Sequence, residues 1–206
     1  MQDDTKMTRP RGRPLSHDPA VTLRKIADTF REKGYSATSL DDVSRNTGLN
    51  RPSLYATFGD KKAMYLSALE RLREDLKLNF GRLERADLSF GQMLKALMAN
   101  SIEKYLAGES GPNGCLAVGT ASAEAVADPD IRKSLNEVLT LIDDSIAALF
   151  KRYGAPNAKS QGRMLAAALH SISVRARSGQ PRALLEEMGR DALKLVVPPP
   201  KPARRL

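Results

Sequence analysis

The sequence predicts an all-α protein of about nine helices. Apolar residues recur at helical spacing along most of its 206 residues, and no segment shows the alternating pattern of a strand. Capping residues, prolines and glycines fall where such helices would begin and end. The composition, 41% hydrophobic with only 5% aromatic residues and no tryptophan, predicts a mainly aliphatic core.

The first expected helix begins at Asp18-Pro19 and stops at Gly34. Aspartate is a favoured N-cap, proline is tolerated in a first helical turn, and glycine is common just beyond a helix end. Between them an apolar stripe recurs at positions i, i+3, i+4 and i+7, formed by Leu23, Ile26, Ala27 and Phe30. We expect this helix to brace the two short helices that follow it.

Residues 38–62 predict two short helices joined by a tight turn and followed at once by a third. Ser39 is a candidate N-cap, and Asp42 can satisfy a second amide of the same turn. Gly48 would end this helix in the left-handed conformation. Asn50 is placed to cap the next helix, whose first turn contains a proline.

This second helix, about residues 51–58, would bury Leu54 and Phe58 and direct polar side chains outward. A helix so short is not stable in water by itself, so its neighbours must hold it. Two short helices joined by a glycine turn, with donors facing outward, form the helix-turn-helix plan, here at about residues 39–58. The second helix of that plan enters the DNA major groove. A helical hairpin inside an ordinary bundle is the alternative for a capped pair alone.

The stretch, together with the Gly34-Tyr35 before it, resembles the DNA-binding domain of TetR-family transcriptional regulators. Residues that match the family pattern at its spacing are Gly34, Tyr35, Thr38, Ser39, Asp42, Val43, Gly48, Leu49, Leu54, Tyr55, Phe58, Lys61 and Met64. The chain departs at Ser44, Pro52 and Thr57, where alanine, glycine, and an aromatic residue or histidine are more usual. Because Thr57 would lie on the reading helix, its departure concerns which DNA sequence is read.

The resemblance also implies roles for individual residues. Base edges would be met by Asn50, Arg51, Ser53 and Thr57. The phosphate backbone would be met by Thr38, Ser39, Tyr55 and Lys61. In the family the last two long helices of each subunit pair, here about residues 158–177 and 181–197. We therefore expect a homodimer whose two heads read a palindromic site on double-stranded DNA.

The resemblance divides the chain into a DNA-binding domain over residues 16–76 and an effector-binding and dimerisation domain over residues 77–197. Residues 1–15 lack apolar periodicity and are expected to form a flexible basic arm, and residues 198–206 a disordered tail. Within the arm, Arg11 and Arg13 stand in a Pro-Arg-Gly-Arg-Pro run that looks like the core of an AT-hook. Such arginines can enter a narrow minor groove. A solvated basic tail is the alternative.

The C-terminal part carries no specific motif, but its apolar spacing predicts further helices. Asp60 would begin a long helix that links the head to the remainder. Asp128-Pro129 is another cap and proline start, and Asn157 is expected to cap a later helix. The expected ranges are about 88–106, 115–127, 130–152, 157–177 and 181–197. The helix at 115–127 is rich in small residues, so its neighbours could approach closely.

No catalytic arrangement is present in the sequence. It lacks a glycine-rich phosphate loop, a nucleophile elbow and an H-E-x-x-H motif. We interpret the adjacent carboxylates Asp41-Asp42 as a cap and Asp143-Asp144 as a solvated face. One cysteine and two well-separated histidines exclude a zinc finger, and we expect no metal and no cofactor. We interpret His170 as a core or interface residue, with an effector contact as the alternative.

Cys115 is the one chemically suggestive residue outside the head. We place it at a helix N-terminus, where the helix dipole would lower the pKa of a thiol and favour the reactive thiolate. Some regulators of this family have a similar Gly-Cys-Leu, and certain of those respond to electrophiles or oxidants. A sensor role is thus one hypothesis, and a buried, inert cysteine is the other.

These observations predict a sequence-specific DNA-binding regulator, in this family most often a repressor, that answers a small-molecule effector in a mostly apolar C-terminal pocket. The formal net charge of +9 favours an acidic partner, either nucleic acid or anionic lipid. No apolar run is long enough for a membrane span or a signal peptide, so we expect a cytoplasmic protein with no membrane partner. The alternatives are a regulator that senses through Cys115, a helical enzyme or small-molecule carrier, and a basic architectural DNA-binding protein.

Overall fold

Every described element of the chain is helical. The computed structural model describes residues 18–108 and 111–197, and within these ranges it has nine α-helices, one π-helix and no strand. In chain order the helices are α1 (Pro19–Lys33), α2 (Leu40–Thr47), α3 (Arg51–Phe58), α4 (Lys61–Arg85), α5 (Phe90–Leu106), the π-helix η1 (Ala117–Ala121), α6 (Ser122–Glu124), α7 (Pro129–Arg152), α8 (Ala158–Arg177) and α9 (Arg182–Val196). The predicted all-α class is confirmed.

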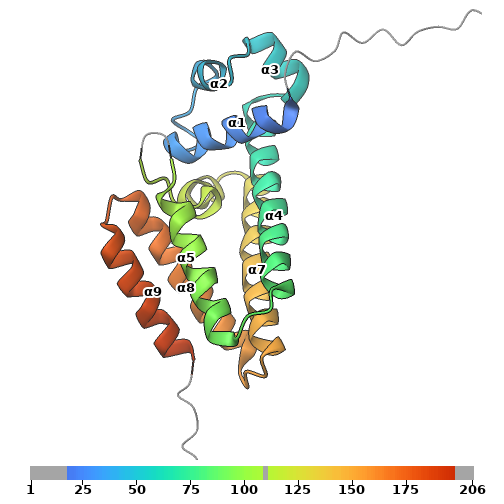
Figure 1. Ribbon diagram of the computed structural model, residues 1–206. Helices are drawn as coiled ribbons and strands as arrows, with labels where there is room; N and C mark the ends of the chain where they lie inside the picture. The colour runs from blue at the N-terminus through green and yellow to red at the C-terminus, as the bar shows by residue number, and fades with distance from the viewer. Residues whose placement is uncertain (1–17, 109–110, 198–206) are drawn as a thin grey trace, which may run out of the picture.

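The first three helices form a small head at one end of the molecule, and the longer helices extend away from it (Figure 1). Helix α4 leaves the head and packs along α7, which in turn packs against α8. Helices α5 and α9 both pack on α8 and on each other. One helix, α4, therefore belongs to both parts, because its first turns complete the head and its remainder lies on the C-terminal helices.

The head has its own apolar core. Ile26 and Phe30 of α1, Val43 of α2 and Leu54 of α3 have no exposed surface. Tyr65 of α4 is equally buried, and its ring meets that of Phe30 edge-on with 5.0 Å between centroids. The expected apolar stripe of the first helix is thus the face that holds the head together.

The predicted caps of the head are confirmed. Asp18 caps α1, and Ser39 and Asp42 form a complete capping box at the start of α2. Gly48 ends α2 with a φ of 76°, in the left-handed region that favours glycine. The side-chain oxygen of Asn50 accepts the N–H of Ser53 over 2.9 Å and begins α3. Local capping therefore fixes where each head helix begins.

The C-terminal helices depart from expectation in three places. Helix α5 begins at Phe90 instead of residue 88, because Ser89 forms a capping box with Gln92. The helix expected over 115–127 is a five-residue π-helix followed by a three-residue α-helical turn. Asn157 does not cap α8, since its side chain makes no capping hydrogen bond. Helices α7 and α9 begin within one residue of the predicted positions.

The predicted domain boundary at residue 76 falls inside α4, which runs without a break from Lys61 to Arg85. The division into a DNA-binding and an effector-binding domain stays a prediction. The predicted arm with Arg11 and Arg13, and the predicted tail at 198–206, lie outside the described residues. Within the described residues, no helix is long and apolar enough to span a membrane.

Candidate nucleic-acid interface

Helix α3 presents a polar surface that is held in place by one buried anchor. Leu54 is fully buried in the head and Phe58 is partly buried, whereas Arg51 and Tyr55 are exposed. Ser53 and Thr57 are partly exposed on the same short helix. The helix therefore offers most of its polar side chains to a partner, as the sequence predicted.

Arg51 makes a two-point contact with Asp41 of α2. Its Nε donates to one carboxylate oxygen over 2.9 Å and its Nη2 donates to the other over 2.7 Å. These hydrogen bonds, together with the opposite charge, lower the pKa of Asp41 and raise that of Arg51. Both side chains are more than half exposed, so the pair can open at modest cost. The two hydrogen bonds to Asp41 thus orient the guanidinium of Arg51.

Of the Asp41-Asp42 pair that we interpreted as a cap, Asp42 takes part in the capping box, whereas Asp41 pairs with Arg51. Asp41 lies ten positions before Arg51, and only the placement of α2 against α3 brings the two together. No local spacing rule connects these positions, so the pair could not be predicted from the sequence.

Lys61, expected to contact phosphate, lies at the first residue of α4. Its Nζ donates to the carbonyl oxygen of Ser36 over 3.2 Å and sits 4.7 Å from the centre of the Tyr35 ring. The ammonium therefore fastens the loop between α1 and α2 to the start of α4. Being partly exposed at a helix N-terminus, the same residue can still face a phosphate. Tyr55, on α3, is 48% exposed.

Thr38 and Ser39 are adjacent but differ in accessibility. Thr38 is only 2% exposed, and its hydroxyl donates to the carbonyl oxygen of Gly34 over 2.6 Å. Its side chain thus holds the loop before α2 and is turned away from a partner, contrary to the expected phosphate contact. Ser39 is exposed at the start of α2, with its hydroxyl bonded to Asp42.

Asp42, at the N-terminus of α2, forms ion pairs with two basic side chains. Its carboxylate accepts from the ammonium of Lys33 over 2.5 Å and from Arg45 over 3.3 Å. The hydrogen bond from Lys33, followed by those from the hydroxyl and backbone N–H of Ser39, holds the pKa of Asp42 well below its usual range. The capping box therefore keeps its charged form at neutral pH.

The position of Cys115 contradicts the premise of the sensor hypothesis. Cys115 lies two residues before the start of η1, and hydrogen bonds from the backbone N–H groups of Val118 and Ala117 act to lower the pKa of its thiol. Burial outweighs them, so the pKa is raised instead of lowered. Cys115 keeps some exposed surface. Its raised pKa favours the protonated thiol, which is less reactive than the thiolate.

His170 lies partly buried on α8, and its Nε2 is enclosed without a hydrogen-bond partner among the described residues. Burial lowers its pKa, while the charge of Asp143 on α7 acts in the opposite direction. The imidazole is therefore kept neutral. Within the described residues, no group of three or more His, Cys, Asp and Glu side chains is arranged to hold a metal ion.

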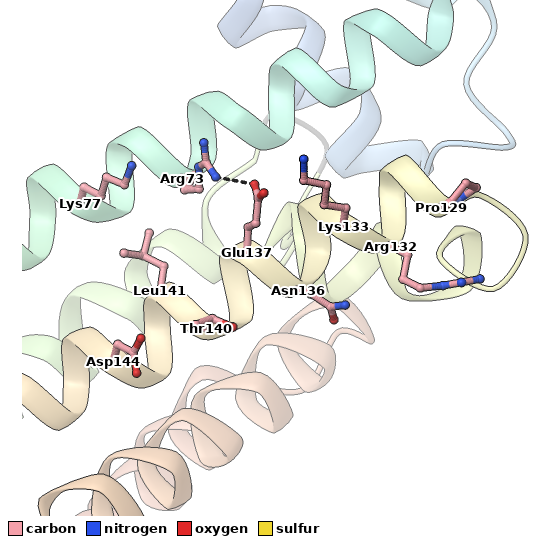
Figure 2. A pocket seen from close by; sticks show the side chains of 10 residues that line it. All are labelled: Arg73, Lys77, Pro129, Arg132, Lys133, Asn136, Glu137, Thr140, Leu141 and Asp144. Carbon is pink, nitrogen blue, oxygen red and sulfur yellow. Dashed lines mark hydrogen bonds and ion pairs between the residues drawn. The ribbon is translucent and has the colours of Figure 1, made fainter.

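A groove of about 670 Å³ runs between α4 and α7 (Figure 2). Figure 2 shows Arg73 of α4 bonded across it to Glu137 of α7, and Arg73 also pairs with Glu70. Most lining side chains are polar or charged, among them Lys77, Arg132, Lys133, Asn136, Thr140 and Asp144. The groove differs from the mostly apolar effector pocket expected from the sequence, which stays a prediction.

Comparison with known proteins agrees with this geometry. The family model described as "Bacterial regulatory proteins, tetR family" matches residues 23–68, which run from α1 into the first half of α4. The chain is 24% identical to the HTH-type transcriptional repressor BdcR of Escherichia coli over 174 residues, covering 84% of this chain and 86% of that protein. It is 41% identical to the E. coli repressor ComR over 61 residues, covering 30% and 29% of the two chains.

Solved structures show the same fold over nearly the whole chain. The TetR-family regulator CifR, as a cysteine mutant complexed with a 26-base-pair operator, is similar with a TM-score of 0.73 at 24% identity, covering 89% of this chain and 98% of that one. The reduced form of E. coli NemR has a TM-score of 0.72 at 15% identity, covering 88% and 99%. The helix-turn-helix geometry, the family-model match over residues 23–68 and the similarity to curated repressors show that the chain belongs to the TetR family of transcriptional regulators, DNA-binding proteins that are not enzymes.

Proposed function

We propose that this regulator binds a palindromic operator as a homodimer, and that an effector held by the C-terminal helices changes its affinity for DNA. The observation that carries the proposal is the outward presentation of α3, anchored by Leu54 and capped by Asn50. Repression is the direction we favour, because BdcR and ComR are named as repressors. The regulator FasR of Mycolicibacterium smegmatis, 24% identical over 166 residues, is named as an activator.

In this proposal base edges are read by Asn50, Arg51, Ser53 and Thr57. Arg51 would exchange the carboxylate of Asp41 for a base edge, since its planar donors suit the two acceptors of guanine. Asn50 already uses its side-chain oxygen as a cap, so its amide group would be the part that reads.

The phosphate backbone would be contacted by Ser39, Tyr55 and Lys61, and minor-groove contacts by Arg11 and Arg13 of the arm would add affinity. Thr38 is left out of this set because its side chain is buried. Its contribution would be to hold Ser39 in position at the start of α2.

The proposed dimer surface lies on α8 and α9. Met164 and Val174 of α8 are 62% and 51% exposed, and Leu195 of α9 is 86% exposed. Large apolar side chains exposed along neighbouring helices are typical of a protein–protein interface. A two-fold pairing there would direct the two heads to the same side of the dimer. Sedimentation of the Met164→Glu variant, expected to be monomeric, tests the placement.

The function is tested by selecting duplexes with the purified protein and measuring affinity by fluorescence anisotropy at several salt concentrations. Arg51→Ala should cost about 1–3 kcal/mol on the selected operator and much less on random DNA. Lys61→Ala should weaken binding to every sequence and flatten the salt slope by about one. Equal losses on operator and random DNA for Arg51→Ala would contradict its assignment to base reading.

A basic architectural protein, which would bind DNA through its arm alone, predicts a different outcome for one deletion. Removing residues 1–15 would then abolish sequence selectivity. For a regulator that reads DNA through α3, the deletion should reduce affinity and preserve the selected sequence. Native mass spectrometry of the purified protein, with and without denaturation, would reveal a co-purified effector.

A further inference from the structure

Arg177, the last residue of α8, connects three segments that are far apart in the sequence. Its Nη1 donates to the carbonyl oxygen of Arg31 and, over 3.2 Å, to that of Asn113. Its Nη2 donates to the carbonyl oxygen of Glu32 over 3.1 Å. Arg31 and Glu32 form the last turn of α1 in the head, and Asn113 lies in the loop before η1. One guanidinium thus joins the head, this loop and a long C-terminal helix.

The contact supplies what the C-terminal end of α1 lacks. The last carbonyls of a helix have no N–H partner within it and carry the negative end of the helix dipole. A guanidinium presents five donors in a fixed plane, so it can bond to several carbonyls at once, whereas the ammonium of lysine is a compact charge on a flexible stem. Arg177 is therefore a cap for α1 that comes from a different part of the chain.

Two glycines bring the backbone around η1 close to the C-terminal end of α8. A Cβ on Gly114, whose φ is 65°, would lie 2.7 Å from the carbonyl oxygen of Ser173 and 3.4 Å from the Cβ of Arg177. A Cβ on Gly119 of η1 would lie 3.4 Å from the Cδ of Arg177. The buried hydroxyl of Ser173, one turn earlier on α8, accepts the N–H of Cys115 over 2.8 Å. The backbone at Gly114, Cys115 and Gly119 thus lies close to Ser173 and Arg177 of α8.

A second arginine also stabilises this junction. The Nη2 of Arg31 donates to the carbonyl oxygen of Ala107, just beyond α5, over 2.9 Å. The end of α1 is therefore tied to α5 by its own side chain and to α8 by Arg177. Because α1 packs on α2 and α2 packs on α3, a rotation of α1 would move the reading helix with it.

Other polar contacts between head and C-terminal part involve η1, α6 and α7. The hydroxyls of Tyr65 and Thr120 are 2.6 Å apart. Ser36 donates to Glu124 over 2.6 Å, and Lys62 pairs with Asp128 over 2.8 Å and with Asp130 over 2.7 Å. Arg177 alone, among the contacts described here, joins the head to α8, which carries the proposed dimer surface.

We propose that Arg177 is a positioning residue for operator binding, which sets the direction of the reading helix relative to α8 without touching DNA. The inference rests on the proposed dimeric operator binding. Without the guanidinium, each head would turn more freely on α4 while its DNA-contacting side chains stay intact. The two heads of a dimer would then no longer be held at one separation.

The test compares Arg177→Gln and Arg177→Lys with Arg175→Gln, which removes the same charge from an exposed position on the same helix end. Anisotropy is measured on the operator selected by the unmodified protein, on versions with half-sites one or two base pairs closer or farther apart, and on a single half-site. We expect Arg177→Gln to lose about tenfold on the operator and little on the half-site. Its dependence on half-site spacing should be flatter, Arg177→Lys should lie between, and Arg175→Gln should match the unmodified protein.

Equal losses on operator and half-site, or an unchanged spacing dependence, would overturn the inference. If the unmodified protein selects no operator, the proposed function fails instead. Hydrogen exchange of the DNA-free proteins then tests the link by itself. Amides of residues 30–36 should exchange faster in Arg177→Gln than in Arg175→Gln, and identical exchange in the two variants would refute the capping role.

Discussion

Helix α2 and the segment formed by η1 and α6 are both too short to be stable by themselves, yet they are held in different ways. Helix α2 has a capping box at one end and a left-handed glycine at the other, all within its own sequence. The segment η1–α6 has no side-chain cap at either helix. Its contacts come from a distance, through Tyr65 of α4 and through Ser173 and Arg177 of α8.

The difference corresponds to what each region does. A head whose helices begin at caps from their own sequence can keep its shape while it moves as a unit on the C-terminal helices. The segment η1–α6 instead depends on contacts with α4 and α8. A shift of either helix would break these contacts or move the segment with it. The π-helical turn, a feature often found at functional sites, lies where those two helices and the head meet.

The largest expected effect would break the anchor of the head. Leu54→Ala removes the one fully buried side chain of α3 and should lower the free energy of unfolding by about 2–5 kcal/mol. Urea unfolding measures the loss. Leu78→Ala on α4, where the side chain is 56% exposed, is the matched control and should change stability by less than about 0.5 kcal/mol. Similar effects of both changes would mean that Leu54 does not anchor α3.

The next effect concerns the distant support of η1. The hydroxyl of Tyr65 and that of Thr120 are 2.6 Å apart in a buried site, and Thr120 also donates to the carbonyl oxygen of Leu116. Thr120→Val leaves the Tyr65 hydroxyl without its partner and should cost about 1–3 kcal/mol. The Tyr65→Phe/Thr120→Val double variant should lose less than the sum of the single variants. Strict additivity in urea unfolding would show that the pair is not coupled.

A smaller loss of stability is expected when a residue that caps a helix is replaced than when the head anchor is removed, and none when the replaced residue makes no capping bond. Ser39→Ala removes a hydroxyl that accepts the N–H of Asp42, and should cost about 0.5–2 kcal/mol. Asn157→Ala, before α8, removes a residue that makes no capping bond and should be close to neutral. Thermal unfolding of the two variants under identical conditions measures the difference. A substantial loss from Asn157→Ala would restore the cap predicted from the sequence.

The same contrast explains how much could be predicted from the sequence. The caps at Asp18, Ser39 and Asn50 involve neighbours within four residues, so local rules located the head helices correctly. The pairing of Asp41 with Arg51 and the capping of α1 by Arg177 depend on tertiary placement, which no spacing rule provides. The raised pKa of Cys115 also depends on tertiary placement. A helix N-terminus can be predicted from the sequence, whereas the burial that raises this pKa cannot.

The smallest effect distinguishes the two regions by their response to acid. In the head, the lowered pKa of Asp42 means that its contribution to stability is present above the unfolded value of about 3.9 and is lost only as the pH falls through the lower folded value. In the C-terminal part, burial lowers the pKa of His170, with the charge of Asp143 opposing. Its neutral form therefore favours folding above the unfolded value of about 6.5, and this contribution is lost as the pH falls through the folded value.

Urea unfolding at pH 7.5 and pH 5.5, at one protein concentration, should thus show a loss of stability in the acid that His170→Gln reduces. His17→Gln, which alters the other histidine, is the control and should retain the full loss. The capping box should not contribute in this range, because Asp42 stays charged throughout it. An identical loss of stability in acid for His170→Gln and the unmodified protein would contradict this prediction. It would mean that the imidazole can be protonated in the folded state, and that α8 is less tightly packed here than the buried Nε2 of His170 indicates.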